Sequence, residues 1–130
     1  SLRTTARRDG DSYVLDGTKF WIPHGGYADV YVVMARTGGP GAGGVSAFLV
    51  PGDTPGLSFG KKEEKMGLRA SPTVELILEG ARIPVENLLD REGTGFRISM
   101  RALDSGRICV AALNQANLDT VAAAVAAVTR

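Results

Sequence analysis

Cysteine and histidine are scarce in this chain of 130 residues. The only cysteine, Cys109, excludes an internal disulfide and a metal site built from several cysteines. We interpret it as a small core residue of a helix rather than a nucleophile. The only histidine, His24, lies beside two glycines in the segment WIPHGG, which favours a turn residue without a catalytic duty. The sequence therefore predicts no catalytic residue and no metal site of its own.

An excess of charge of one sign is also missing. Fifteen Lys and Arg against fourteen Asp and Glu give a net charge of +1, which argues against a nucleic-acid partner. No apolar run approaches the roughly 20 residues of a membrane helix, and no basic leader precedes an apolar block. We therefore expect a cytoplasmic protein with no membrane or nucleic-acid partner.

The two ends of the sequence suggest a piece of a larger protein. The chain starts at Ser1 rather than Met, on a polar segment. It ends at Arg130 directly after a helical pattern, without a Gly or Pro stop signal. We expect a fragment.

The chain has the pattern of a β protein up to about residue 86. Glycine, 17 of 130 residues, is about twice as frequent as usual. Asp9-Gly10-Asp11 and Asp16-Gly17 predict tight turns. These features predict a mainly β fold, a small antiparallel β-barrel or sandwich of about seven strands. The predicted strands cover residues 3–8, 12–15, 18–22, 29–36, 45–50, 57–62 and 73–78.

Two neighbouring segments of the β part differ sharply in composition. Residues 29–36, DVYVVMAR, form a nearly continuous apolar run, which predicts a strand covered on both faces. Residues 37–44, TGGPGAGG, have little helix or strand potential and predict a flexible connection.

The pattern changes to that of one long α-helix after Thr94, a candidate N-cap. Large apolar residues then recur at spacings of three and four, which places them on one helix stripe. We expect the distal half of the helix to pack on helices outside this chain, and we divide the chain into a β domain, 1–92, and the first helix of a truncated helical domain, 93–130. The stripe residues are Phe96, Met100, Leu103, Leu118, Val121, Val125 and Val128.

Four segments, in this order and spacing, resemble the acyl-CoA dehydrogenase family. The similarity runs from about residue 2 to residue 112 and matches the family's middle β-barrel domain plus the start of its C-terminal helical domain. The segments are KFWIPHGGYADVYVVMAR, VSAFLVPGDTPGLSFG, KMGLRASPTVELILEGARIPVENLL and REGTGFRISMRALDSGRI.

The resemblance implies a flavin-dependent parent enzyme. It would oxidise an acyl-CoA thioester to the 2,3-enoyl-CoA, with a carboxylate base taking the α-proton and FAD accepting the β-hydride. It would form homo-oligomers and pass electrons to an electron-transferring flavoprotein. The family's catalytic Glu lies outside the matched segments, so we expect this chain alone to be inactive and to bind FAD weakly or not at all. The alternatives are a non-catalytic β-barrel module that binds acyl-CoA or a partner, and an oxidase-type relative that gives electrons to oxygen.

The same resemblance places Trp21, Ile22 and Pro23 against the isoalloxazine ring of FAD. An indole offers a flat apolar surface, and strand backbone groups can bond the ring edge. The alternative for Trp21 is an ordinary aromatic of the barrel core. The sequence departs from the family here, because Pro23 replaces a Thr or Ser whose hydroxyl can bond flavin N5, and His24 replaces an Asn. A proline has neither a hydroxyl nor a backbone N–H.

The segment LDSGRI implies a second site. Its Asp104 and Arg107 match the residues that hold the CoA part of the substrate in family members. Side chains three positions apart lie on one helix face, and a guanidinium suits a phosphate or a ring plane. The alternative is a surface ion pair worth a few tenths of a kcal/mol.

Overall fold

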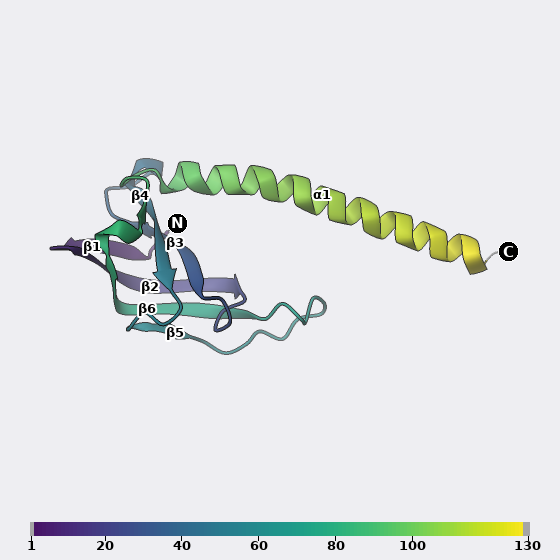
Figure 1. Cartoon of the computed structure of the whole chain (residues 1–130), viewed down its shortest axis with the longest axis horizontal. Coiled ribbons are helices and arrows are strands. Elements are labelled where there is room, and N and C mark those ends of the chain that lie inside the picture. The colour runs from purple at the N-terminus through teal and green to yellow at the C-terminus, as the bar shows by residue number, and fades with distance from the viewer. Residues whose placement is uncertain (1, 129–130) are drawn as a thin grey trace. The chain divides into compact units, whose positions relative to one another are not determined.

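The computed structural model describes residues 2–128, with side chains of the helix described to Thr120 and at positions 122 and 123. Seven strands form one sheet, and one long helix follows them (Figure 1). The predicted mainly β fold with about seven strands and a C-terminal helix is confirmed. The chain divides into two compact units, one that ends at Phe96 and one that begins at Arg97.

The elements follow each other in a simple order along the chain. Short 3₁₀ turns at Ala42–Gly44 and Val85–Asn87 and the last strand were not expected from the sequence. The strands are β1 (Thr5–Asp9), β2 (Ser12–Pro23), β3 (Val30–Arg36), β4 (Val45–Pro51), β5 (Leu57–Phe59), β6 (Thr73–Pro84) and β7 (Leu88–Leu89), and the helix is α1 (Gly95–Val128).

The strand order in the sheet is β5-β6-β2-β1-β3-β4-β7. Neighbouring strands are antiparallel except β1 and β3, which run parallel and share the single pair Thr5 and Arg36. The sheet is therefore mixed rather than purely antiparallel. Because β1 is short, it fills only part of the space between the two longer strands that flank it.

The first turn lies where the sequence predicts it, but the second does not exist. β1 and β2 form a hairpin in which Gly10 adopts a φ of 62°, as primed turns require. At Asp16 and Gly17, β2 continues through a bulge against β6 instead of turning. The Asp16 carboxylate accepts the Gly80 N–H at 2.7 Å, so a hydrogen bond between the two strands bridges the bulge and β2 stays paired with β6. The prediction of a turn at Asp16-Gly17 was wrong for this reason.

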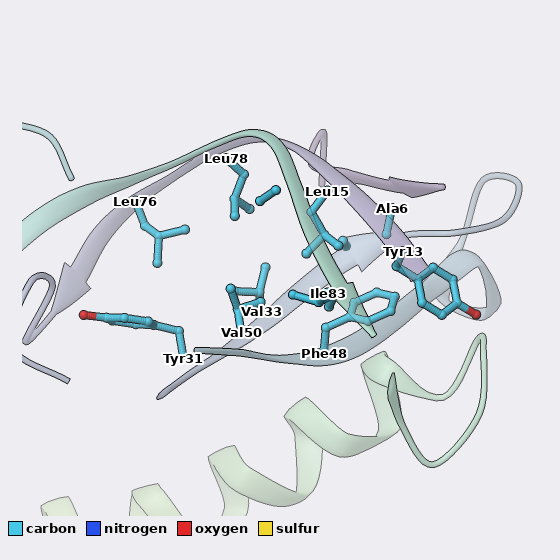
Figure 2. Packing of buried hydrophobic residues seen from close by; sticks show 12 residues of the cluster. Ala6, Tyr13, Leu15, Tyr31, Val33, Phe48, Val50, Leu76, Leu78 and Ile83 are labelled. Carbon is cyan, nitrogen blue, oxygen red and sulfur yellow. The ribbon is translucent and has the colours of Figure 1, made fainter. Parts of the chain in front are cut away.

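The core lies inside the curled sheet (Figure 2). In the figure, Leu76 and Leu78 of β6 face Tyr31 and Val50 of β3 and β4 across the interior. These side chains are almost completely buried. Burying one such large apolar side chain stabilises the fold by about 1.5–3 kcal/mol. The core therefore joins the β2–β6 part of the sheet to the β3–β4 part.

Strand β3 is covered on one face only. Tyr31, Val33 and Ala35 point into the core, whereas Val30 and Val32 on the opposite face are 51% and 56% exposed. The prediction of a strand covered on both faces was therefore wrong for the residues that the structure describes. An apolar outer face on a sheet strand is unusual for a surface left to water.

Helix α1 begins at Gly95, so Thr94 stands in the predicted N-cap position, and its hydroxyl donates to the Arg91 carbonyl at 2.7 Å. Cys109 is exposed, so its interpretation as a core residue was wrong. Leu118 of the predicted stripe is also exposed. No helix in the described part combines the length and the apolar character that crossing a membrane demands. The side chains of Val121, Val125 and Val128, also predicted on the stripe, lie outside the described residues.

Candidate functional site

Strand β2 carries a bulge near its C-terminal end, at Phe20 and Trp21. Lys19 and Ile22 are three residues apart on β2 but pair with residues of β6 only two apart. β2 therefore holds one extra residue at this point. A bulge redirects the side chains that it carries, and bulges are common beside functional sites.

Trp21 is the residue that this bulge places outward. Its φ is 56°, a left-handed conformation that costs a side-chain-bearing residue about 1–2 kcal/mol. Its indole is 74% exposed, which rules out the alternative of a core aromatic. The Phe20 ring lies beside it, with ring centroids 6.4 Å apart and planes tilted by 60°. The fold thus presents a large flat aromatic side chain to the outside at a local energetic cost.

The turn after β2 is fixed by its backbone rather than by side chains of catalytic type. His24 donates its backbone N–H to the Pro72 carbonyl at 2.8 Å. The buried Tyr31 holds the same turn, since its hydroxyl donates to the His24 carbonyl at 3.2 Å and accepts the Gly26 N–H at 2.9 Å. His24 itself is exposed in this turn, as the sequence predicts. The end of β2 is therefore firmly connected to the core through β3.

An apolar groove of about 410 Å³ lies next to this turn, between β2 and β3; we call it the β2–β3 groove. This groove was not predicted from the sequence. The one available signal was the apolar run of residues 29–36, whose outer-face side chains form one side of the groove. The lining residues include Lys19, Ile22, Pro23, Val30, Val32 and Met34.

Lys19 is the one lysine of the β2–β3 groove. Burial lowers the pKa of its ammonium group to about 8, because the charged form loses water contact. Within the described part of the chain, no carboxylate forms an ion pair with it. The groove therefore holds a basic group that is not neutralised by a partner.

The lowered pKa of Lys19 predicts a pH dependence of stability. Between about pH 8 and the pKa of 10.5 that a free lysine has, the unfolded chain binds more protons than the folded chain, so the free energy of unfolding should rise with pH. Burial and a hydrogen bond to Glu92 raise the pKa of the Tyr13 phenol. This shift acts in the opposite direction above pH 10, because the unfolded state then loses that proton first. Urea denaturation at several pH values between 8 and 10 measures the slope of the free energy of unfolding against pH.

The matched control for this prediction is another lysine. Lys19→Met should flatten the slope, whereas Lys61→Met, at an exposed position, should keep it. An equal slope in all three proteins would show that Lys19 keeps its ordinary pKa.

Asp104 and Arg107 lie three positions apart on α1 and form an ion pair of 3.4 Å. Both side chains are about three-quarters exposed, so the pair is available to a ligand but contributes little to stability. It belongs to the second compact unit, whereas Trp21, Ile22 and Pro23 belong to the first. The assignment of this pair to CoA binding stays a prediction.

Charged groups elsewhere in the described part of the chain do not form a metal site. Among residues 2–128, no group of three or more His, Cys, Asp or Glu side chains is placed to hold a metal ion. The run Lys61 to Lys65 is mostly exposed, as the sequence predicts for a solvated turn. Its last residue also shapes the loop, because the Lys65 ammonium donates to the carbonyls of Leu68 and Ser71. The end of β2 and the β2–β3 groove therefore remain the candidate site.

Comparison with known proteins gives consistent matches. The family described as acyl-CoA dehydrogenase, middle domain, matches residues 1–81. Mitochondrial isobutyryl-CoA dehydrogenase of Dictyostelium discoideum is 55% identical over 113 residues, which are 86% of this chain and 27% of that protein. The structure of butyryl-CoA dehydrogenase from Megasphaera elsdenii superposes with a TM-score of 0.82 at 46% identity, covering 85% of this chain and 30% of that one. A structure described as the electron transferring flavoprotein of Acidaminococcus fermentans gives a TM-score of 0.83 at 50% identity, with 86% and 30% covered.

The fold and the matched region define a β domain of the middle-domain type, followed by a helix. The chain belongs to the acyl-CoA dehydrogenase family, which confirms the resemblance inferred from its four segments. It spans less than a third of the length of the relatives that it matches.

Proposed function

We propose that the parent polypeptide is a FAD-dependent oxidoreductase that converts acyl-CoA thioesters into 2,3-enoyl-CoA. The α-proton goes to a carboxylate base, and the β-hydrogen leaves as a hydride, so the substrate loses two electrons. In this reaction the chain supplies one wall of the flavin site, and the base comes from a part of the parent outside these residues. By itself the chain would then catalyse no dehydrogenation and would bind FAD weakly or not at all.

The observation that carries this proposal is the position of Trp21. This chain holds Trp21 in a left-handed conformation at a bulge. The residue is 74% exposed, although an indole is more favourably buried. Strain of this kind persists where the surrounding structure imposes it, often at ligand sites. A flat ring stacked on Trp21 would remove the exposed apolar surface from water.

The residues at the end of β2 fit an isoalloxazine ring in shape and polarity. Trp21 offers a flat face, and the half-buried Ile22 extends the apolar surface toward the β2–β3 groove. Pro23 excludes water from the same wall but donates no hydrogen bond. When bound, FAD supplies the acceptor for the hydride. The role of these three residues is to orient the ring and to keep water away from it.

The helix supplies the second part of the proposal. The ion pair of Asp104 and Arg107 would hold the CoA portion of the substrate, since a guanidinium binds phosphate oxygens and stacks on ring planes. The proposed β domain comprises residues 1–92, and residues 93–130 form the start of the proposed helical domain.

The partners and the location are proposals. An electron-transferring flavoprotein would take the electrons, as the family resemblance implies. A homo-oligomer would complete the helical surroundings. We propose a cytoplasmic location, although the similar Dictyostelium discoideum enzyme is named as mitochondrial.

The test of the function uses the intact parent polypeptide. Purified with FAD and mixed anaerobically with a short acyl-CoA, it should lose its yellow absorbance as the flavin is reduced. Reoxidation by an electron-transferring flavoprotein but not by oxygen supports the dehydrogenase, and rapid reoxidation by oxygen supports the oxidase alternative. A protein that binds acyl-CoA without any bleaching would be the non-catalytic module and would overturn the proposal.

The same assay tests the departure at Pro23. Pro23→Thr restores a hydroxyl at this position, and one hydrogen bond worth about 0.5–1.5 kcal/mol should speed flavin reduction by about 2- to 10-fold. Pro23→Val, with a similar shape but no hydroxyl, is the control. Equal reduction rates for all three proteins would show that the hydroxyl at this position does not act on the flavin.

A further inference from the structure

Residues 90–95 run from the end of β7 into the first residue of α1; we call this segment the linker. The whole linker belongs to the same compact unit as the sheet. The Tyr13 hydroxyl of β2 donates to the Glu92 carboxylate at 2.5 Å. The Gly93 N–H donates to the Ser46 hydroxyl of β4 at 2.9 Å. Two strands that are not neighbours in the sheet therefore each hold the linker through one side-chain hydroxyl.

Two glycines bring the backbone of the linker into direct contact with the sheet. A Cβ at Gly93 would lie 2.5 Å from the carbonyl oxygen of Gly43, in the 3₁₀ turn before β4. A Cβ at Gly95 would lie 2.6 Å from the carbonyl carbon of Ser46. Both contacts are with backbone atoms, so no side chain can move aside to make room, and only glycine allows so close an approach. The beginning of α1 is therefore attached to β4 along its backbone.

The two hydroxyls that hold the linker come from residues that are fixed in the core. Tyr13 is buried and its ring packs on Phe48, and Ser46 is completely buried. The Thr37 hydroxyl lies 2.7 Å from the Ser46 hydroxyl, so a second hydrogen bond fixes the Ser46 side chain. Removing either hydroxyl would release the linker at one point while the apolar core stays filled.

The attachment of the linker matters for the ion pair of Asp104 and Arg107, because both residues lie further along the same helix. They follow Gly95 by about three turns, or about 14–18 Å along the helix axis. At that distance, a change of about 10° in the direction of the axis displaces a side chain by about 2–3 Å, nearly the length of a hydrogen bond. The contacts of a guanidinium with phosphate depend on distance and orientation. A small change at the linker is therefore enough to misplace the pair.

We propose that Tyr13 and Ser46 are positioning residues that act through the linker on the ion pair of α1 and so set the affinity for the CoA portion of the substrate. This inference rests on the proposed function, in which that pair binds CoA. The nucleotide of CoA is remote from the carbons that react, so a lost contact with it weakens binding in the ground state and in the transition state alike. The effect is therefore expected in KM rather than in kcat.

The experiment compares two substrates of the intact parent polypeptide. One is a short acyl-CoA, and the other is the same acyl group on pantetheine, which keeps the thioester but lacks the nucleotide. Tyr13→Phe and Ser46→Ala should each raise the KM for the acyl-CoA by about 3- to 10-fold. Both variants should leave kcat and the KM for the acyl-pantetheine unchanged, which also shows that they fold. Ser58→Ala, at an exposed position of β5, is the matched control and should change neither KM.

The outcomes separate this inference from the proposed function. If the parent oxidises acyl-CoA but both variants keep its KM, or if the KM rises equally for the two substrates, Tyr13 and Ser46 do not position the CoA site. A parent that does not oxidise acyl-CoA at all would overturn the proposed function, and this inference with it.

A double-mutant cycle tests whether Tyr13 acts through the linker. Glu92→Ala should raise the KM for the acyl-CoA as much as Tyr13→Phe does, because the two side chains form one hydrogen bond. The double variant should show no further rise. Additive effects would contradict the proposed route from Tyr13 to the helix.

Hydrogen exchange of the Gly93 amide tests the attachment at Ser46 without any activity. In the intact parent, Ser46→Ala should make this amide exchange at least about 10-fold faster, because its acceptor is lost. Ser58→Ala should leave the exchange rate unchanged. An unchanged rate in Ser46→Ala would show that the Ser46 hydroxyl does not hold the linker.

Discussion

Replacing Phe48 by alanine is expected to lower the free energy of unfolding by about 3–5 kcal/mol. Phe48 of β4 is completely buried, and its ring lies 4.9 Å from the ring of Tyr13 on β2. Its removal leaves a cavity in the core between β4 and β2, two strands that are not neighbours in the sheet. Since small domains are stable by about 5–15 kcal/mol, this change removes a large share of the total.

The matched control is the same substitution on the surface. Phe20 is 57% exposed, so Phe20→Ala should cost at most about 1 kcal/mol. Urea denaturation of the 130-residue chain, followed by near-ultraviolet circular dichroism of its tyrosines, measures both values. Equal losses for the two variants would contradict the core described here.

Replacing Trp21 by glycine in the parent polypeptide is expected to weaken FAD binding by about 10-fold or more, which corresponds to about 1.4 kcal/mol of lost stacking. The same change should leave the stability of the flavin-free protein unchanged or raise it by up to about 1 kcal/mol. The reason is that glycine adopts a φ of 56° without strain, and the 74% exposed indole contributes little to packing. Flavin titration and urea denaturation measure the two effects.

Trp21→Phe is the control for this prediction. It keeps a flat ring and the strained backbone, so it should retain most of the affinity for FAD without a gain in stability. If Trp21→Gly binds FAD as tightly as the original protein, the indole does not form a wall of the flavin site. If it instead destabilises the protein strongly, the tryptophan has a packing role that its exposure does not indicate.

Some of the fold followed from local sequence signals. Gly10 predicts the β1–β2 hairpin because the residues that close the turn are neighbours in the chain. The 3.6-residue period predicts α1 because helical hydrogen bonds are local. The family resemblance added the candidate residue Trp21, which neither composition nor period would have singled out.

Other features depended on contacts between distant segments. Asp16 and Gly17 predict a turn by composition, but Gly80, far along the chain, donates to Asp16 and keeps β2 straight enough to pair with β6. Whether Trp21 is buried or exposed depended on its bulge, which exists only when β2 is paired with β6. No local sequence pattern predicts such a pairing between distant strands.

By itself, the sequence determined the family, the β character of the first part, the helix and the absence of a disulfide. Only the tertiary structure decided that Trp21 points outward, that Lys19 lines an apolar groove and that β2 and β4 hold the linker to α1. The physical reason is that local backbone preferences act over a few residues, whereas sheet register and burial are set by partners that the chain brings together from far apart.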